Sequence, residues 1–577
     1  MRSHTISLIF ACVALCSAQG LPPGVLQEVD LDGVIGFPNE FEATAMAVDP
    51  AGGVYLAGTL QSVPEETTAI LTAGELAEDN ILVVKMDAQL ERVLYKTVIG
   101  GSGQEILYAM TVDESGAVYL SGITRSEDFP ETFDLAQPLF TSGQQAFVVK
   151  LNFQGDQIVY SAILGAGVHA RAISVDAAGA VLVGGEADST TFETTPGVLH
   201  PFPAPHGSGA FLAKLDPAGD RVLAAGAYNL PALQFISVRP NGDILFVAAG
   251  RLTILNSAMS VELAVAPIGV ADSVTLDEAG DVYLAGRLSV GLQIRVQKFS
   301  PDGSELLFVR TFDGSWNRIR RTPLVIGSNG RLHMFHTQSA NIPTLHTVQT
   351  CAGNLPPPAG YAGLALRFIP EEGAHAVLGP DGATLYHTFT PDVQDALLSP
   401  VDGSIVAIQR RILYDAETGE PQASYQWARI DPGFIAENHQ VIGCVGHGAT
   451  YDPLPLSPGA LMVAFGSRLG PADGALFEPV EGRVPFEVAG TTVTADSAPA
   501  PVVYAQDGQV NFLTPWPIRT DGELARICVQ YGGEESCVMA GTAPVAGGSY
   551  LPPRHFIHAV PGCAIAAAAR SSCSDTT

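Results

Sequence analysis

The sequence predicts an all-β protein in which a seven-bladed β-propeller is followed by a small immunoglobulin-like β-sandwich. Three observations predict this fold. A hairpin motif recurs, with turn glycines at Gly52, Gly116, Gly179 and Gly242 that are spaced by 64, 63 and 63 residues. A second type of hairpin alternates with the first. The period then stops near Gln440, where the composition changes. Two hairpins per period make a four-stranded unit, which is the size of a propeller blade.

The first hairpin is Ala-Val-Asp-Pro-Ala-Gly-Gly-Val-Tyr-Leu-Ala-Gly at residues 47–58, and it returns at 111–122, 174–185 and 275–286. Apolar alternation on both sides of Asp-x-x-Gly is typical of a hairpin. The aspartate can accept from backbone N–H groups of the turn, and glycine supplies the positive φ that the turn needs. The repeated aspartates could also suggest a ring of ligands, but the turn role already explains them. They are Asp49, Asp113, Asp176 and Asp277.

The second hairpin occurs at residues 147–156, 211–220 and 296–304, with a related copy that lacks the glycine at 83–87. Ordered along the chain, the two types alternate from Gly52 to Gly419 through fourteen turns, which predicts seven four-stranded units. One such unit cannot bury both of its faces, so the units must pack on one another, and a closed ring removes exposed sheet edges. We expect the N-terminal segment 25–37 to supply the strand that closes the ring.

Units four and five are short, and the sixth carries an insertion from Ala340 to Gly373. The stretches Asp-Phe-Pro at 128–130, Phe-Glu-Thr-Thr-Pro-Gly-Val-Leu-His at 192–200 and Gly-Ala-Phe-Leu-Ala-Lys-Leu-Asp-Pro-Ala-Gly at 209–219 resemble the bacterial seven-bladed β-propeller repeat family, the SBBP repeat. The resemblance covers about residues 40–430. It implies the propeller fold in a secreted or surface protein and supplies no active site.

The chain beyond Gln440 has a different pattern. Pro-Gly at 458–459, Phe-Gly-Ser-Arg-Leu-Gly-Pro at 465–471, Pro-Ala-Pro at 499–501 and Gln-Val-Asn at 509–511 resemble the Solibacter uncharacterised C-terminal domain. The same stretch alternates in short segments, at 461–465, 491–494 and 501–504, between Gly, Pro and Asp. We therefore expect an immunoglobulin-like sandwich at 441–541, after a propeller at 38–440.

The N-terminus has the three-part form of a secretory signal, with Arg2, an apolar run at 6–16 and small residues before a cleavage point after Ala18. This predicts a signal peptide at 1–18 and a mature protein that is secreted to the extracellular space or cell surface, with the periplasm as an alternative. No later run is long enough to cross a membrane. The tail at 542–577 is expected to be poorly ordered.

Eight cysteines are present, and two of them lie in the predicted signal. An even number of remaining cysteines in an exported chain favours disulfides over metal ligands. The Gly532-Gly533 turn could place Cys528 opposite Cys537. We also expect pairing within the tail and, by elimination, between the insertion and the domain junction. These candidate pairs are Cys528–Cys537, Cys563–Cys573 and Cys351–Cys444.

Composition limits the partners. Acidic residues number 59 against 29 basic ones, which gives a formal charge of −30 and repels nucleic acid and anionic lipid. Neither a phosphate-binding loop nor a nucleophile elbow is found. Gly-Gly-Ser-Gly at 100–103 is expected to connect blades. His333 and His336 could suggest a metal pair, but residues three apart on a strand point to opposite faces.

The sequence thus predicts no catalytic residue, no cofactor site and no metal site. The preferred hypothesis is a non-catalytic binding or surface-scaffold protein whose rim loops contact a protein or a cell-envelope glycan. The alternative is an extracellular polysaccharide hydrolase or lyase, with a site assembled from several blades at the mouth of the central channel. Converging titratable side chains with shifted pKa values would favour the enzyme.

Overall fold

A computed structural model gives the structure of the chain, and every regular element among its described residues is a β-strand. This confirms the all-β class. The predicted signal, most of the insertion and nearly all of the tail lie outside these residues, as do Cys351, Cys563 and Cys573. The described residues are 25–30, 41–61, 69, 71–73, 76, 79–134, 144–188, 194–199, 208–228, 230, 233–248, 250–268, 271–287, 293–313, 323–337, 372–414, 421–433, 440–448, 456–518 and 524–542.

Residues 41–313 form five sheets, which we call the first to fifth blades in chain order. In each, the four main strands follow one another and pair antiparallel. The first blade consists of β2 (Phe41–Val48), β3 (Val54–Leu60), β5 (Asn80–Met86), β6 (Val93–Ile99) and β4 (Leu71–Ala73). The second consists of β7 (Glu105–Val112), β8 (Val118–Thr124), β10 (Gln145–Leu151), β11 (Ile158–Ala166) and β9 (Phe133–Asp134).

The next three blades have four strands each. The third consists of β12 (Val168–Val175), β13 (Val181–Asp188), β14 (Ser208–Leu215) and β15 (Val222–Tyr228). The fourth consists of β16 (Leu233–Val238), β17 (Ile244–Ala248), β18 (Arg251–Leu255) and β19 (Glu262–Pro267). The fifth consists of β20 (Ser273–Leu276), β21 (Val282–Arg287), β22 (Gln293–Phe299) and β23 (Leu306–Asp313).

A sixth sheet has seven strands, because the long strand β27 takes part in two ladders. Its first half, to Pro391, pairs with β26, and its second half, from Asp392, pairs with β28. The strands of this sheet are β24 (Leu324–Ile326), β25 (Leu332–Thr337), β26 (Glu372–Leu378), β27 (Thr384–Leu398), β28 (Ile405–Tyr414), β29 (Pro421–Ile430) and β1 (Val25–Asp30).

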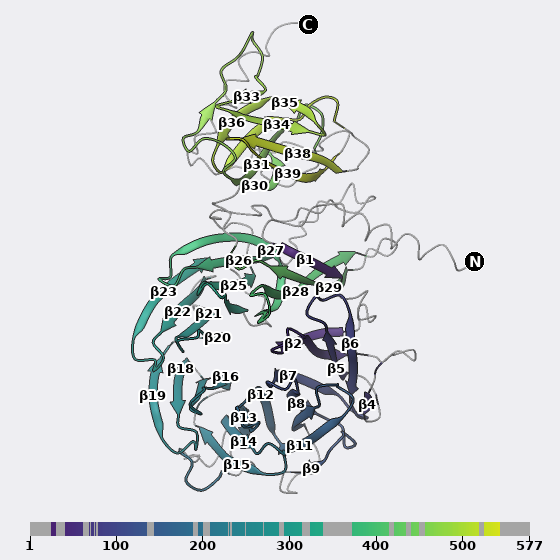
Figure 1. Cartoon of the computed structure of the whole chain (residues 1–577), viewed down its shortest axis with the longest axis vertical. Helices are drawn as coiled ribbons and strands as arrows, with labels where there is room; N and C mark the ends of the chain where they lie inside the picture. Colours follow the sequence, from purple (N-terminus) through teal and green to yellow (C-terminus); the bar gives the residue numbers. More distant parts are fainter. Residues whose placement is uncertain are drawn as a thin grey trace, which may run out of the picture.

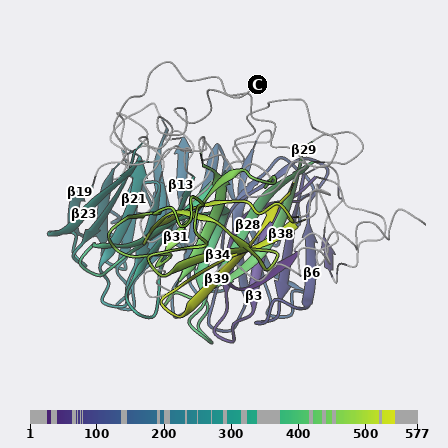
Figure 2. The same ribbon diagram turned by 90° about the horizontal axis from the view of Figure 1, so that it is seen from above.

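The six sheets stand side by side around a common centre (Figure 1). Strands β2, β7, β12 and β16 lie towards the centre, and β6, β15, β19 and β23 lie towards the outside. Seen from above, the strands run across the thickness of the ring (Figure 2). This arrangement is that of a β-propeller.

The two ends of the ring meet at the first blade. Strand β1 pairs antiparallel with β29, from Val25 opposite Ile430 to Asp30 opposite Gln426. The Met46 N–H of β2 donates to Asp395 Oδ2 of β27, at 3.1 Å. The expectation that the N-terminal segment supplies a closing strand is therefore confirmed for residues 25–30.

Hydrophobic clusters fill every junction between neighbouring sheets. Tyr119 packs between the second and third blades, whereas the adjacent Leu120 packs between the first and second. Trp427 of β29 shares a cluster with Leu56 of β3, which completes the circle. Both faces of the middle strands of the blades are thus buried, and this explains why 47% of the residues are hydrophobic and only 15% charged.

The turn chemistry matches the sequence. Gly52, Gly116 and Gly179 have φ between 80° and 85°, as Asp-x-x-Gly turns require. Two turns use another residue at this position, and both residues are fully buried. Leu90 and Met259 adopt φ of 60° and 57° with side chains that pack into the blade clusters.

The last hairpin differs from the expectation. The alternation of hairpin types predicts that Gly419 lies in a hairpin of the second type, between the third and fourth strands of its unit, and this prediction is wrong. In the structure, residues 415–420 connect β28 to β29, and β29 is followed on its outer side by β1. Because the N-terminal strand occupies the outer position, the last unit supplies three strands and has no second hairpin.

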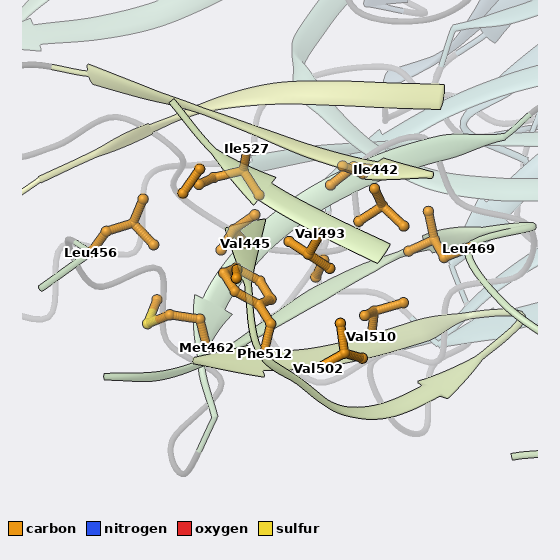
Figure 3. Packing of buried hydrophobic residues seen from close by; sticks show 14 of the residues in the cluster. Ile442, Val445, Leu456, Met462, Leu469, Val493, Val502, Val510, Phe512 and Ile527 are labelled. Atoms are coloured by element: carbon orange, nitrogen blue, oxygen red, sulfur yellow. The ribbon is translucent and has the colours of Figure 1, made fainter. Parts of the chain in front are cut away.

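The C-terminal region forms two sheets over one core. One contains β30 (Val441–His447), β31 (Leu461–Ser467), β37 (Gln509–Leu513), β36 (Val502–Gln506) and β32 (Ala475–Leu476). The other contains β33 (Glu487–Val488), β34 (Thr491–Ala495), β38 (Leu524–Tyr531) and β39 (Glu534–Gly541), with β35 (Ala498–Ala500) paired to β34. Figure 3 shows Met462 and Phe512 of the first sheet facing Val493 and Ile527 of the second.

Candidate functional site

The repeated turn aspartates have a structural role. Asp49 Oδ1 accepts from the N–H groups of Ala51 and Gly53, at 3.0 and 2.8 Å. The equivalent oxygens accept from turn N–H groups in the second, third and fifth blades, at Asp113, Asp176 and Asp277. The turn hypothesis is confirmed by these bonds.

The second oxygen of each turn aspartate faces a lysine from the third strand of the same blade. The Nζ to Oδ2 distances are 3.0 Å for Lys85 and Asp49, 3.9 Å for Lys150 and Asp113, 2.9 Å for Lys214 and Asp176, and 3.3 Å for Lys298 and Asp277. Sequence reasoning missed these pairs, although a lysine recurs in the copies of the second hairpin at 83–87, 147–156, 211–220 and 296–304. Since each carboxylate is used within its own blade, these aspartates do not form one shared site.

A group of half-exposed polar side chains lies on the strands nearest the ring centre. We call Tyr108, His169, Arg171 and Glu186 the inner-strand cluster. They come from β7, β12 and β13, and therefore from two neighbouring blades. Arg171 Nε lies 3.4 Å from Glu186 Oε1, and its guanidinium lies 5.0 Å from the centre of the Tyr108 ring. The rings of Tyr108 and His169 are nearly parallel, with centroids 6.4 Å apart.

Burial lowers the pKa of His169, Arg171 lowers it further, and Glu186 opposes the effect. The imidazole is therefore neutral at pH 7. With the Gln144 amide turned so that its nitrogen faces the ring, Gln144 donates to His169 Nε2 at 3.3 Å, and the proton of the neutral ring then lies on Nδ1. No described acceptor lies within hydrogen-bond distance of Nδ1.

The inner-strand cluster continues into a chain of side chains that crosses three blades. Gln144 accepts from Arg125 Nε at 2.9 Å in the same amide orientation. Arg125 Nη1 donates to Gln104 Oε1 at 2.8 Å, and Gln104 Nε2 donates to Asp79 Oδ2 at 2.5 Å. A continuous series of side-chain hydrogen bonds thus links polar groups of the first, second and third blades.

Glu105 follows Gln104 at the start of β7 and is completely buried. Burial raises its pKa, and hydrogen bonds from Ser126, Thr124 and the Gly101 N–H oppose that rise. Gly100 to Gly103 connect β6 to β7, as expected. The glutamate therefore holds this connector against the end of β8, and Ser126 is one of its hydrogen-bond donors.

One histidine of β25 pairs with a histidine of β26, and the sequence does not predict this pair. His333 and His336 point to opposite faces, because His333 Nδ1 contacts His375 Nε2 at 3.0 Å while His336 lies against Phe312. His375 comes from β26, and its ring stacks on Phe335 at 4.3 Å. Burial and then Arg331 lower the pKa of His333 to about 3. His333 is therefore uncharged, and both rings of the pair are buried.

Cys528 and Cys537 are directly opposite each other on β38 and β39, and their sulfurs are bonded. This is the pair that the Gly532-Gly533 turn predicts. Among the described residues, the one group of three potential metal ligands is Cys528, Glu535 and Cys537. Its two sulfurs are already bonded to each other, so neither is a thiolate. Cys444 lies on β30, but the Cys351–Cys444 and Cys563–Cys573 pairings involve cysteines outside the described residues.

The radial sheets, the closing strand and the repeated turns define the class of the N-terminal region as a repeat-built β-propeller. No helix in the described part of the chain is long and apolar enough to cross a membrane.

No family model matches the sequence, and no curated protein matches it. Among solved structures, the RRP9 WD40 repeats are 9% identical, covering 71% of this chain and 99% of that one, with a TM-score of 0.43. BamB from Moraxella catarrhalis is 12% identical, covering 70% of this chain and 96% of that one, with a TM-score of 0.33. The Doa1 WD40 β-propeller domain is 8% identical, covering 71% and 97%, with a TM-score of 0.39.

Proposed function

We propose that this chain is an exported, non-catalytic binding protein whose propeller presents the inner-strand cluster to a protein partner. The observation that carries the proposal is the cluster itself, in which Tyr108, His169, Arg171 and Glu186 from adjacent blades are half exposed around one point. Tyrosine and arginine are, with tryptophan, the residues enriched in binding hot spots, and the Arg171–Glu186 ion pair holds the guanidinium in place before binding.

The polar side chains near the inner-strand cluster hydrogen-bond to one another, and this supports binding rather than catalysis. Ser126 donates to Glu105, and Arg125 and Gln144 are used in the chain that positions His169. The formal charge of −30 favours a neutral or basic partner surface and disfavours nucleic acid. The Cys528–Cys537 bond supports export, because disulfides persist in oxidising compartments.

The finer architecture belongs to the same proposal. β27 serves as the outer strand of one four-stranded ladder and the inner strand of the next, which supports seven blades. Two antiparallel sheets over one core support an immunoglobulin-like C-terminal domain. We place the repeats with the SBBP repeat family and the C-terminal domain with the Solibacter uncharacterised family, on the residues that resemble them.

One observation favours a second candidate, an extracellular polysaccharide hydrolase or lyase. His169 is neutral at pH 7 and lies on the same strand as Arg171, which pairs with Glu186 of the next strand, so a base, a cation and a carboxylate of the third blade lie close together. A lyase needs a base to remove a proton and a cation to neutralise a substrate carboxylate.

The test uses the mature full chain on a protein and glycan array beside a hydrolase and lyase screen. Arg171→Ala and Tyr108→Ala should each weaken protein binding by about ten-fold or more. Arg92→Ala is the matched control, because that arginine is 75% exposed on an outer turn and pairs with Asp87. Turnover of a glycan that His169→Gln abolishes would overturn the binding proposal, and so would protein binding that both cluster variants leave unchanged.

A further inference from the structure

The outer edges of the first three blades are covered by the chain itself. β4 pairs parallel with β6 in the first blade, and β9 pairs parallel with β11 in the second. In the third blade, Thr195 contacts the outer edge of β15. Backbone groups that would otherwise be exposed at these edges are therefore hydrogen-bonded.

The second and third blades use the same contact, which we call the threonine clamp. The Thr132 N–H donates to the Ser161 carbonyl at 2.8 Å, and the Ser161 N–H donates to Thr132 Oγ1 at 2.6 Å. Thr195 and Ala225 repeat both bonds at 2.9 Å. One threonine thus satisfies both outward backbone groups of one residue on the outer strand.

The length of the connection between the second and third strands determines which blades have a chain segment along their outer edge. Between their second and third strands, the first three blades have the long connections 61–79, 125–144 and 189–207. The fourth has only residues 249–250, and the fifth has only 288–292. A segment of two or five residues is too short to reach the outer edge and pair there.

Strands β19 and β23 consequently end their sheets with no further strand beside them among the described residues. Large apolar side chains are exposed on both strands or beside them: Val261, Leu263, Val265, Leu306, Leu307 and Val309. Exposed apolar residues on an unpaired edge are the usual acceptor for an added strand.

The repeat identifies the residues equivalent to the clamped ones. In the second and third blades, a turn hydrogen bond closes the second hairpin at the carbonyl of Gln157 and of Arg221. The clamped residue, Ser161 or Ala225, lies four positions after that carbonyl. In the fourth and fifth blades the same turn hydrogen bond is accepted by the carbonyls of Val261 and Glu305. Counting four positions on, Val265 and Val309 are the residues equivalent to Ser161 and Ala225. The Val309 carbonyl accepts from Arg310 Nη1 at 2.8 Å.

β23 is the better acceptor of the two. It is eight residues long without proline, whereas β19 ends at Pro267 and carries the Arg251–Glu262 ion pair. The formal charge of −30 adds a preference for basic residues in the incoming segment.

We propose that β23 binds an extended segment of another protein as an added parallel strand, with a threonine clamped on Val309, an apolar residue after it and basic flanking residues. This site is separate from the inner-strand cluster and does not depend on it. Phe133, which follows Thr132 and pairs with Ala162, shows the apolar position that the incoming segment would fill.

The probe is a fluorescent peptide, Lys-Lys-Val-Thr-Phe-Val-Lys-Lys, titrated against the mature full chain by polarisation. We expect saturable binding with a Kd below about 1 mM, and a loss of several-fold when valine replaces the threonine of the peptide. Val309→Pro should abolish binding, because it removes the outward N–H without removing a bond inside the sheet. Arg310→Ala should tighten binding by about five-fold, because it releases the Val309 carbonyl.

Val309→Lys keeps the backbone groups but blocks edge pairing by charge, so it separates loss of the site from misfolding in Val309→Pro. Val265→Lys on β19 is the matched control and should bind as the unchanged chain does. Absence of saturable binding would overturn the proposal, as would binding that both Val309 variants retain. Self-association that depends on Val309, measured by sedimentation, would also overturn it by showing a second copy as the occupant.

Discussion

Lys85 Nζ lies 3.0 Å from Asp49 Oδ2, and both side chains are only 3% exposed. Asp49 belongs to the turn between β2 and β3, whereas Lys85 belongs to β5, so the pair ties the two hairpins of the blade together. The ammonium group also lies 3.6 Å from the centre of the Phe153 ring of the second blade. Burial raises the pKa of Asp49, but Lys85, Gly53 and Tyr55 together hold it below its ordinary value.

Breaking this pair should cost more than breaking an exposed one. Lys85→Met leaves the Asp49 carboxylate buried without a cation, and we expect a loss of about 3–5 kcal/mol in the free energy of unfolding. The double variant Asp49→Asn with Lys85→Met should recover part of that loss, because neither charge remains. Arg92→Ala, which removes an exposed partner of Asp87, should cost less than about 1 kcal/mol. Urea unfolding measures all four chains, and equal losses for Lys85→Met and Arg92→Ala would refute the expectation.

Acid should destabilise the ring through His333. Its pKa in the folded chain is about 3, below the value of about 6.5 in the unfolded chain, so the unfolded chain binds the extra proton between these pH values. The stabilising contribution is therefore complete above pH 6.5 and is lost as the pH falls towards 3. His333→Gln should reduce the pH dependence of the unfolding free energy by about 1.4 kcal/mol per pH unit between pH 6 and pH 4. Between pH 7 and pH 8 the two chains should run parallel, and a parallel course at pH 4 would contradict the assignment.

Two glycines with similar backbone conformations should respond differently to alanine. Gly155 has φ of 71° and Gly179 has φ of 82°. A Cβ at Gly155 would lie 2.4 Å from Tyr95 Cε2, whereas at Gly179 the nearest atom would be Pro217 Cβ at 3.6 Å. Gly179→Ala should cost about 1 kcal/mol for the left-handed backbone alone. Gly155→Ala should cost about 1–3 kcal/mol more through overpacking. Thermal unfolding compares the two, and equal losses would show that Tyr95 moves aside freely.

Removal of the closing strand should open the ring. Deleting residues 25–30 exposes the outer edge of β29 and uncovers the cluster around Trp427 that Val29 helps to cover. We expect a sharp fall in the melting temperature of the propeller. A synthetic peptide of residues 25–30, added in excess, should restore part of it, because binding to the folded state alone stabilises that state. An unchanged melting temperature would show that closure rests on β27 and β2 instead.

The sequence specifies the strands better than it specifies the side chains that meet between them. Glycine turns and period-two alternation are local, so the hairpins could be predicted, and even the turns without glycine could be located by their flanking residues. Leu90 and Met259 adopt the left-handed conformation, and their side chains fill the core. The backbone cost at these turns is offset by burial against distant residues, which local sequence rules do not include.

The inner-strand cluster was missed because its members lie on three strands of two blades, and only His169 and Arg171 are close along the chain. Tyr108 and Arg171 each lie eight residues before a turn glycine, at Gly116 and Gly179, so they occupy the same repeat position. An alignment of the repeat copies with one another would have placed Tyr108 and Arg171 at the same position. His375 offered no such sign, because it is separated from His333 by 42 residues that include the insertion.

The direction in which β1 leaves the ring has a mechanical consequence. Val25 lies opposite Ile430, so the chain before β1 and the chain after β29 emerge at the same end of this strand pair. A pull applied between the two ends therefore loads the β1–β29 hydrogen bonds one at a time, in the manner of a zipper, instead of shearing them all at once. The next junction carries no such weakness, since the continuous strand β27 crosses it. When force is applied to the two ends of the chain, the ring therefore opens first at β1, at a small force, while the remaining blades stay folded.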